Sequence, residues 1–188
     1  MTDLKLLLPL ILITCSTVLL RAQKTQVKSD LHELNGFLGE WSGDLLIVKE
    51  GDTLQKVPMS LTIAADKARN RIVWNTIYNA NDKPVTKPYF IEPGQTPGNF
   101  LMNENNSIKI PHFLNGNVFS GFYKVMGRYF YTENRLLNDS EMLFTITVIP
   151  EKPDLISGDA VQQGGKIPSV ESHEISIIQT ARLTKAKK

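Results

Sequence analysis

The stretch that decides the fold is NGFLGEWSGDLLIVKE, residues 35–50. Gly39 and Trp41 stand two residues apart, directly before a run in which Leu45 and Ile47 continue the spacing of two that begins at Trp41. A spacing of two is the period of a β-strand with one buried face. The pattern predicts that the largest side chain of this segment lies at the start of the first strand and faces the core.

A short helix is predicted immediately upstream, over SDLHELNGFL, residues 29–38. Ser29 or Asp30 can accept hydrogen bonds from the free N–H groups of the first turn. Apolar residues at helical spacing give the segment one apolar face, formed by Leu31, Leu34 and Leu38.

Downstream, short segments with a period of two alternate with turn signals. The segment 57–63 places Val, Met, Leu and Ile on one face, and NGN at 115–117 is a strong hairpin signal because Asn and Gly tolerate positive φ. About ten strands follow one another every 8–12 residues or so, and residues 150–172 form the longest candidate loop. No segment is long enough to be the helical crossover of a parallel sheet, which excludes an α/β fold.

The pattern predicts an all-β fold, an antiparallel up-and-down β-barrel of about 8–10 strands with a short N-terminal helix. A sandwich has the same strand rhythm, but a long meander leaves two exposed edges unless it closes into a barrel. The 188 residues, 41% hydrophobic and 21% charged, are typical of one globular domain. A net charge of +2 gives no electrostatic signature of nucleic-acid binding.

Residues 1–22 have the pattern of a secretory signal peptide, with a charged start, an apolar run and a small residue at Ala22. Cleavage after Ala22 leaves one domain, residues 23–188, in the periplasm or the medium, with no membrane span. The rival interpretation is a lipoprotein cleaved before Cys15, although Thr14 is a poor residue for that site. Cys15 is the only cysteine, so the domain that remains after cleavage at Ala22 has no disulfide.

The Gly39-x-Trp41 pair, preceded by a short helix, resembles the first strand of lipocalins and related calycin barrels. The resemblance implies that Trp41 seals the closed end of the barrel and that Arg182, in the last strand, packs over its ring. Gly39, Trp41 and Arg182 are therefore the predicted closure residues. The chain departs from lipocalins in having no expected disulfide and almost nothing after its last strand.

Two aromatic-rich segments suggest a ligand cavity inside the barrel. In strand geometry Trp74 and Tyr78 share one face of their segment, and Tyr129, Tyr131 and Arg135 share one face of theirs. An apolar cavity with a few hydroxyl groups is typical of small-molecule pockets. The same rings could instead fill a solid core or lie on the outer face. The predicted ligand-binding residues are Trp74, Tyr78, Tyr123, Tyr129, Tyr131 and Arg135.

Catalytic and metal-binding motifs do not emerge from the sequence. The histidines His32, His112 and His173 lack the spacing of a metal site, and no Gly-x-Ser-x-Gly elbow occurs. We expect neither a cofactor nor a metal. The first hypothesis is an exported, non-enzymatic barrel that binds an apolar or amphiphilic small molecule, such as a lipid. The alternatives are an enzyme that uses a buried Glu133 or His112, and a protein-interaction module with a filled barrel.

Overall fold

The computed structural model describes residues 28–80, 83–162 and 164–187. The predicted signal segment and Cys15 lie outside these residues. No helix in the described part of the chain is long and apolar enough to cross a membrane.

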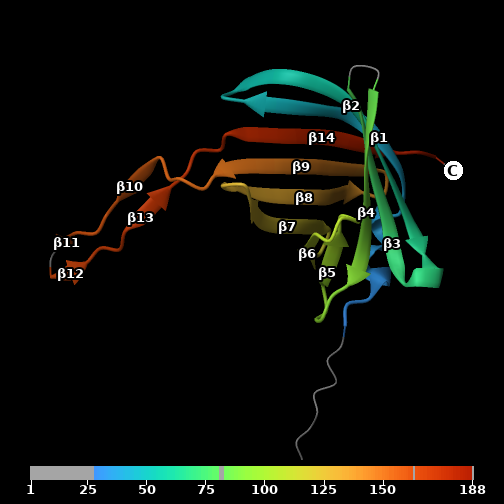
Figure 1. The fold of residues 1–188 in the computed structure, drawn as a ribbon, viewed down its shortest axis with the longest axis horizontal. Helices are drawn as coiled ribbons and strands as arrows, with labels where there is room; N and C mark the ends of the chain where they lie inside the picture. The colour runs from blue at the N-terminus through green and yellow to red at the C-terminus, as the bar shows by residue number, and fades with distance from the viewer. Residues whose placement is uncertain (1–27, 81–82, 163, 188) are drawn as a thin grey trace, which may run out of the picture.

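Ten antiparallel strands close into a barrel in which most neighbours in space are neighbours in sequence (Figure 1). The barrel closes where the first strand pairs with both the second and the last. The predicted all-β antiparallel barrel with a short N-terminal helix is confirmed. Its strands are β1 (Gly39–Lys49), β2 (Asp52–Asp66), β3 (Arg71–Ala80), β4 (Lys83–Pro93), β5 (Asn99–Asn103), β6 (Lys109–Asn115), β7 (Val118–Val125), β8 (Arg128–Asn138), β9 (Glu141–Pro150) and β14 (Ile177–Lys185).

The predicted N-terminal helix is a 3-10 helix, η1 (Leu31–Phe37), which closes one end of the barrel. Asp30 caps it, because its carboxylate accepts from the His32 N–H while the Glu33 carboxylate accepts from the Asp30 N–H. Leu34 and Phe37 are buried on its inner side. A second 3-10 turn, η2 (Lys67–Arg69), joins β2 to β3.

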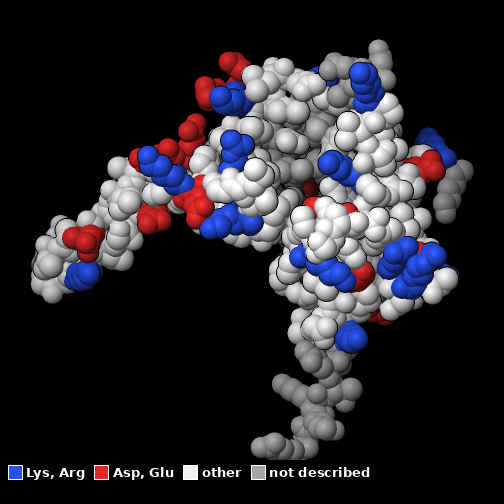
Figure 2. Space-filling model, in the orientation of Figure 1, with Lys and Arg blue, Asp and Glu red and all other residues white. Residues whose placement is uncertain are grey.

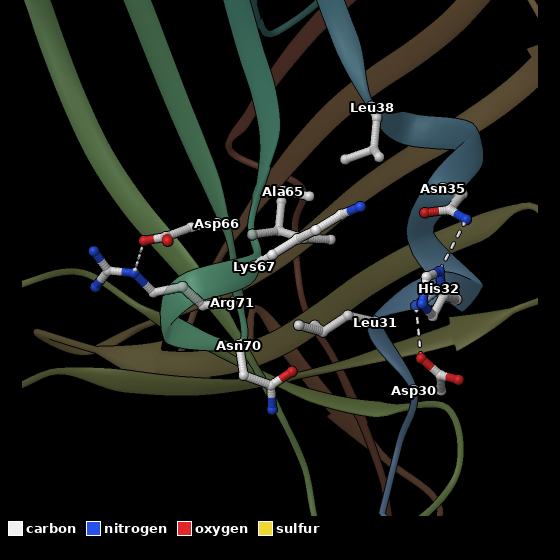
Figure 3. A pocket seen from close by; sticks show the side chains of 11 residues that line it. Asp30, Leu31, His32, Asn35, Leu38, Ala65, Asp66, Lys67, Asn70 and Arg71 are labelled. Atoms are coloured by element: carbon white, nitrogen blue, oxygen red, sulfur yellow. Dashed lines mark hydrogen bonds and ion pairs between the residues drawn. The ribbon is translucent and has the colours of Figure 1, made fainter.

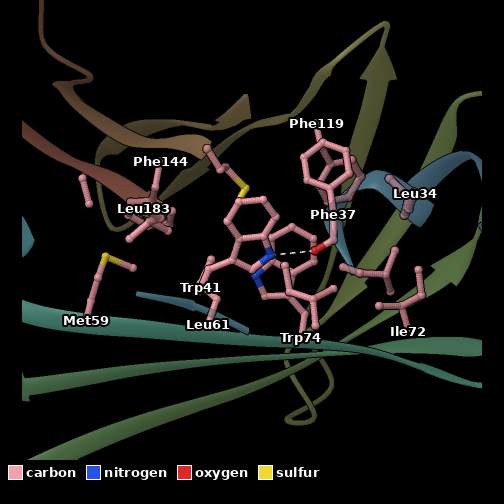
Figure 4. Packing of buried hydrophobic residues seen from close by; sticks show 14 of the residues in the cluster. Leu34, Phe37, Trp41, Met59, Leu61, Ile72, Trp74, Phe119, Phe144 and Leu183 are labelled. Carbon is pink, nitrogen blue, oxygen red and sulfur yellow. Dashed lines mark hydrogen bonds between the residues drawn. The ribbon is translucent and has the colours of Figure 1, made fainter. Parts of the chain in front are cut away.

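Aromatic rings fill the barrel next to this helix (Figure 4). Trp74 and Phe119 are buried, with ring centroids 5.6 Å apart, and the Phe37 ring lies 6.1 Å from each. The Trp41 indole N–H donates to the Phe37 carbonyl at 2.8 Å, which satisfies the one polar group of this buried side chain. The barrel is therefore solid at the helix end, and space for a ligand remains only farther along it.

The two-residue turn Met126–Gly127 fixes which side chains of β7 and β8 point inward. Both turn residues have positive φ, 49° and 71°, so Val125 pairs directly with Arg128. Counting outward from that pair, Tyr123 stands opposite Phe130 and Phe122 stands opposite Tyr131. Opposite residues of an antiparallel pair share a face, so one side of the hairpin carries the first pair and the other side the second.

The expected long loop, residues 150–172, is instead part of an arm, residues 151–176, that projects from the barrel (Figure 1). The arm leaves the end of β9 and returns to the start of β14. Two short antiparallel ribbons build it, one from β10 (Leu155–Ser157) and β13 (Val170–Ser172), the other from β11 (Val161–Gln162) and β12 (Gly165–Lys166). The surface of the barrel is hollowed between the β1–β2 and β3–β4 hairpins (Figure 2).

Candidate ligand site inside the barrel

A small cavity of about 70 Å³ lies inside the barrel, beyond the aromatic core and away from η1. Trp74 forms part of its floor, since this ring also packs against Phe37 and Phe119. The remaining apolar wall comes from Met102, Ile110, Phe144 and Ile146. The other lining residues are polar, so the cavity is much more polar than the core beneath it.

Three phenol groups, Tyr78 on β3, Tyr89 on β4 and Tyr123 on β7, line this cavity. Burial raises the pKa of Tyr78 to about 12 and also raises the pKa of Tyr89 and Tyr123, and the Glu104 carboxylate adds to the shift of these last two. All three therefore keep their O–H proton at neutral pH. Within the described residues none of these hydroxyls has a hydrogen bond to protein, so each is free to bond a ligand or water.

His112 is a buried, neutral member of the same wall. Burial lowers the pKa of its ring from 6.5 to about 4. Its Nδ1 lies 3.2 Å from the Ile110 carbonyl oxygen and its Nε2 lies 3.1 Å from the Thr132 hydroxyl. Because a carbonyl oxygen only accepts, the proton sits on Nδ1 and Nε2 accepts from Thr132. Gly121 makes room for the ring, since a Cβ at that position would stand 2.6 Å from it.

Asn134 supplies the observation that points to a ligand. Asn134 is only 4% exposed. Its Oδ1 is the one buried side-chain oxygen or nitrogen in the described part of the chain that has no hydrogen-bond partner. Leaving a buried acceptor unpaired costs roughly 1–3 kcal/mol. Asn134 lines the cavity, so a ligand donor that reached this oxygen would remove this cost.

The cavity is built for an uncharged polar group. It offers phenol donors, an amide acceptor and a neutral imidazole, and Glu104 is the one carboxylate that lines it. No lysine or arginine among the described residues lines it. A bound anion would therefore meet a carboxylate and no countercharge, which is unfavourable in a buried site.

Three of the six predicted ligand-binding residues, Trp74, Tyr78 and Tyr123, line this cavity. Tyr129, Tyr131 and Arg135 do not, and their prediction as cavity residues is wrong. The turn at Met126–Gly127 pairs Tyr123 with Phe130, so the odd-numbered side chains of β8 point to the outside of the barrel. There the Tyr129 ring stacks on Phe122 with centroids 5.6 Å apart.

Glu133, proposed as a catalytic acid or base, also lies on the outer face of β8. It accepts from the Tyr131 hydroxyl and from Arg135 Nε, both at 2.8 Å. Burial alone would raise the pKa of Glu133, but these two hydrogen bonds outweigh it and lower the pKa. Glu133 is thus an ionised outer-face carboxylate that cannot reach a ligand inside the barrel.

Trp41 is covered by Lys185 rather than by Arg182. The Lys185 ammonium lies 4.8 Å from the Trp41 ring centroid and donates to the Gly36 carbonyl at 3.2 Å. Arg182 points outward and makes two hydrogen bonds of 3.0 Å to the Glu141 carboxylate. Gly39 has φ of 140°, and a Cβ there would stand 2.6 Å from the Lys185 chain. The positive φ therefore favours a glycine at this position, where the flexible lysine chain crosses the indole.

Four polar lining residues escaped the sequence analysis: Tyr89, Glu104, Thr132 and Asn134. Two of them could have been found from the sequence. A two-residue turn at 126–127 sets the pairing of β7 with β8, and that pairing places Thr132 and Asn134 on the same face as Tyr123. Tyr89 pairs with Trp74 across β3 and β4, a partnership that no local pattern shows.

A larger hollow, about 550 Å³, lies outside the barrel between η1 and the β2–β3 turn (Figure 3). Its two carboxylates already accept hydrogen bonds from the protein. Asp66 accepts from Arg71 at 3.0 Å and from Arg69 at 3.2 Å, and the Asp30 carboxylate caps η1. The interior cavity contains the unpartnered acceptor, so it is the better candidate. The described residues include no group of three or more metal-ligating side chains.

Two solved structures are similar to this chain. One is a protein of unknown function of the DUF3598 family from Nostoc punctiforme, 12% identical, with a TM-score of 0.55 over 85% of this chain and 51% of that one. The other is the S-type phycobiliprotein lyase CPES from Guillardia theta, 9% identical, with a TM-score of 0.51 over 84% and 92%.

The present chain thus spans about half the length of the Nostoc protein. No protein-family model and no curated protein matches it by sequence. At these identities the likeness concerns the fold alone, a calycin-like β-barrel.

Proposed function

We propose that the protein is an exported, non-enzymatic barrel that binds a small amphiphile, with an uncharged polar head in the interior cavity. The observation that carries this proposal is the unpartnered Oδ1 of Asn134, a residue that lines the cavity together with three unbonded phenols. A head group that donates a hydrogen bond, such as an alcohol or an amide, matches this acceptor.

The size of the cavity supports a head group rather than a whole ligand. About 70 Å³ is the space of roughly two water molecules, whereas pockets for complete ligands measure about 300–1,000 Å³. The apolar part of the ligand must then extend toward the open end of the barrel. There Val85 stands opposite Tyr78, Phe130 opposite Tyr123, and Val148 opposite Phe130, so apolar side chains share the inner face above the phenols.

Binding of simple ten-carbon amphiphiles tests the proposal. We expect 1-decanol to bind saturably at one molecule per chain and to change tryptophan emission, because Trp74 lines the cavity. Decanoate should bind more weakly because its charge meets Glu104 and no cation. Asn134→Leu and Tyr78→Phe should each weaken 1-decanol binding about 2- to 12-fold, the net effect of one hydrogen bond.

Tyr131→Phe is the matched control, because it removes the same hydroxyl group from the outer face. It should leave binding unchanged. Asn134→Leu should not lower the free energy of unfolding, since it removes an unpaired buried acceptor. No saturable binding of 1-decanol, decanoate or decylamine, or an equal effect of Tyr78→Phe and Tyr131→Phe, would refute the proposal.

A further inference from the structure

The arm, residues 151–176, exposes several large apolar side chains. Leu155 and Ile156 are each 60% exposed, Val161 is 77% exposed and Val170 is 51% exposed. A two-stranded ribbon without a packed face is only marginally stable in water. The arm projects away from its own barrel (Figure 1), so its own chain does not cover these side chains.

One face of the arm's first ribbon carries no charge. Leu155 stands opposite Ser172 and Ser157 stands opposite Val170, so these four side chains share a face. Ile156 stands opposite Glu171 on the other face. The uncharged face, defined by Leu155, Ser157, Val170 and Ser172, is suited to packing against an apolar surface.

A second, largely exposed apolar surface lies on the outside of β6, β7 and β8, where the His173 ring of the same chain's arm meets the Tyr129 ring at a right angle. We call it the outer patch, and it consists of Phe113, Phe122, Tyr129 and Tyr131. Phe113 is 47% exposed and Phe122 is 61% exposed. Phe122 stacks on Tyr129 and stands opposite Tyr131. Contiguous exposed rings of this kind mark an interaction surface.

The charges of the arm and of the barrel are complementary. The arm contains five acidic and two basic residues, whereas the rest of the chain after residue 27 contains 16 basic and 13 acidic residues. Figure 2 shows acidic side chains along the arm. Lys109, Lys124 and Arg135 lie on the strands that carry the outer patch, and each is about half exposed and paired with a carboxylate of its own chain. Opposite net charges favour the approach of an arm to a barrel.

We propose that two copies of this chain form a symmetric dimer in which the arm of each packs its uncharged face on the outer patch of the other. A chain with two unlike, uncovered patches forms an open filament unless the contacts close. A two-fold axis closes the contacts, because the arm of each copy then packs on the outer patch of the other and no patch is left over. The contact orders both arms and covers both outer patches.

The mass of the purified protein in solution, followed by light scattering at rising concentration, tests this assembly. We expect a species of twice the chain mass. Leu155→Ser on the uncharged face and Phe122→Ser on the outer patch should each weaken association about tenfold or more. Ile156→Ser is the matched control, because Ile156 is equally exposed but points to the opposite face of the ribbon. It should leave the dimer intact.

Mixing the two weakened variants gives a second readout. A heterodimer of Leu155→Ser and Phe122→Ser keeps one intact arm-to-patch contact, so the mixture should contain more dimer than either variant alone at the same total concentration. Circular dichroism checks that each variant is folded. A wild-type protein that stays monomeric, a dimer that resists both variants, or a mixture that behaves like its components would overturn the proposal.

Discussion

At the scale of single residues, closure of the barrel depends on three residues, Gly39 and Trp41 of the first strand and Lys185 of the last. Lys185 crosses the Trp41 ring, and Gly39 leaves the space for it. The indole N–H is bonded to Phe37 of η1, so helix, first strand and last strand converge on one ring.

Lys185→Ala should lower the free energy of unfolding by roughly 0.5–1 kcal/mol, the worth of a partly exposed cation–π contact. Trp41→Ala should cost about 3–5 kcal/mol through cavity formation. The two losses should not add, because the groups share a contact. Urea denaturation of the double-mutant cycle measures this, with Arg182→Ala as a control that shows no coupling to Trp41. Strict additivity would mean that Lys185 and Trp41 do not interact.

His112 makes stability depend on pH. Its pKa is about 4 in the folded protein and 6.5 in an unperturbed chain. Between these values the unfolded chain binds a proton that the folded protein does not, so stability falls as the pH falls from 6.5 to 4. The expected loss is about 3 kcal/mol.

Urea denaturation at a series of pH values checks the His112 prediction. His112→Gln should flatten the dependence in that window, whereas His32→Gln, which removes an exposed histidine, should not. An unchanged slope in His112→Gln would show that another group is responsible.

At the scale of elements, β4 is the weak point of the closed sheet. It pairs with β3 along Lys83–Ile91 but with β5 only along Phe90–Pro93, so its first half has one free edge within the described strands. Pro84 and Pro88 have no N–H. Both fit beside β3 only if their ring nitrogens face the free edge, where no hydrogen bond is lost. Lys83 and Lys87 add charge there. This composition is how proteins discourage pairing with another strand.

Replacing Pro84 and Pro88 by Val restores two N–H donors to that edge and adds two strong strand formers. The double variant should form aggregates larger than any assembly of the wild type, measurable by light scattering and by a thioflavin assay. Thr86→Val is the control, because it raises strand propensity on the same edge without adding a donor. Equal behaviour of the two variants would show that hydrophobicity, not the missing N–H groups, matters.

At the scale of the whole molecule, three regions of the barrel differ in structure and in proposed role. The helix end is sealed by an aromatic core, the interior holds the polar cavity, and the arm with the outer patch forms the proposed contact between copies. Each task uses a separate face of the barrel, so ligand binding and association can be altered independently by the variants described above.

Export is the whole-molecule prediction that belongs to the N-terminal segment. Cleavage after Ala22 gives a mature protein that begins at Gln23 and has no cysteine. Intact-mass measurement of protein recovered from the periplasm or the medium checks this. A diacylated product that begins at Cys15 would contradict it and indicate a lipoprotein.

The sequence by itself determined the barrel, because strand period, turn residues and the capped helix before Gly39-x-Trp41 are local patterns. It also identified Trp74, Tyr78 and Tyr123 as candidate cavity residues. Local patterns assign residues to two faces of a strand but not which face is inside. That assignment depends on register, which the turn at Met126–Gly127 sets for β8 and which placed Tyr129, Tyr131 and Arg135 outside.

Only the tertiary structure decided which groups meet. Lys185 rather than Arg182 reaches Trp41, because alternate residues of β14 point to opposite faces and the lysine lies at the strand end where Gly39 leaves space. Asn134, whose side-chain oxygen is unpartnered, and Tyr89 line one cavity from strands far apart in the sequence. Hydrogen-bond satisfaction is a property of the packed barrel, so no reading of one segment could reveal it.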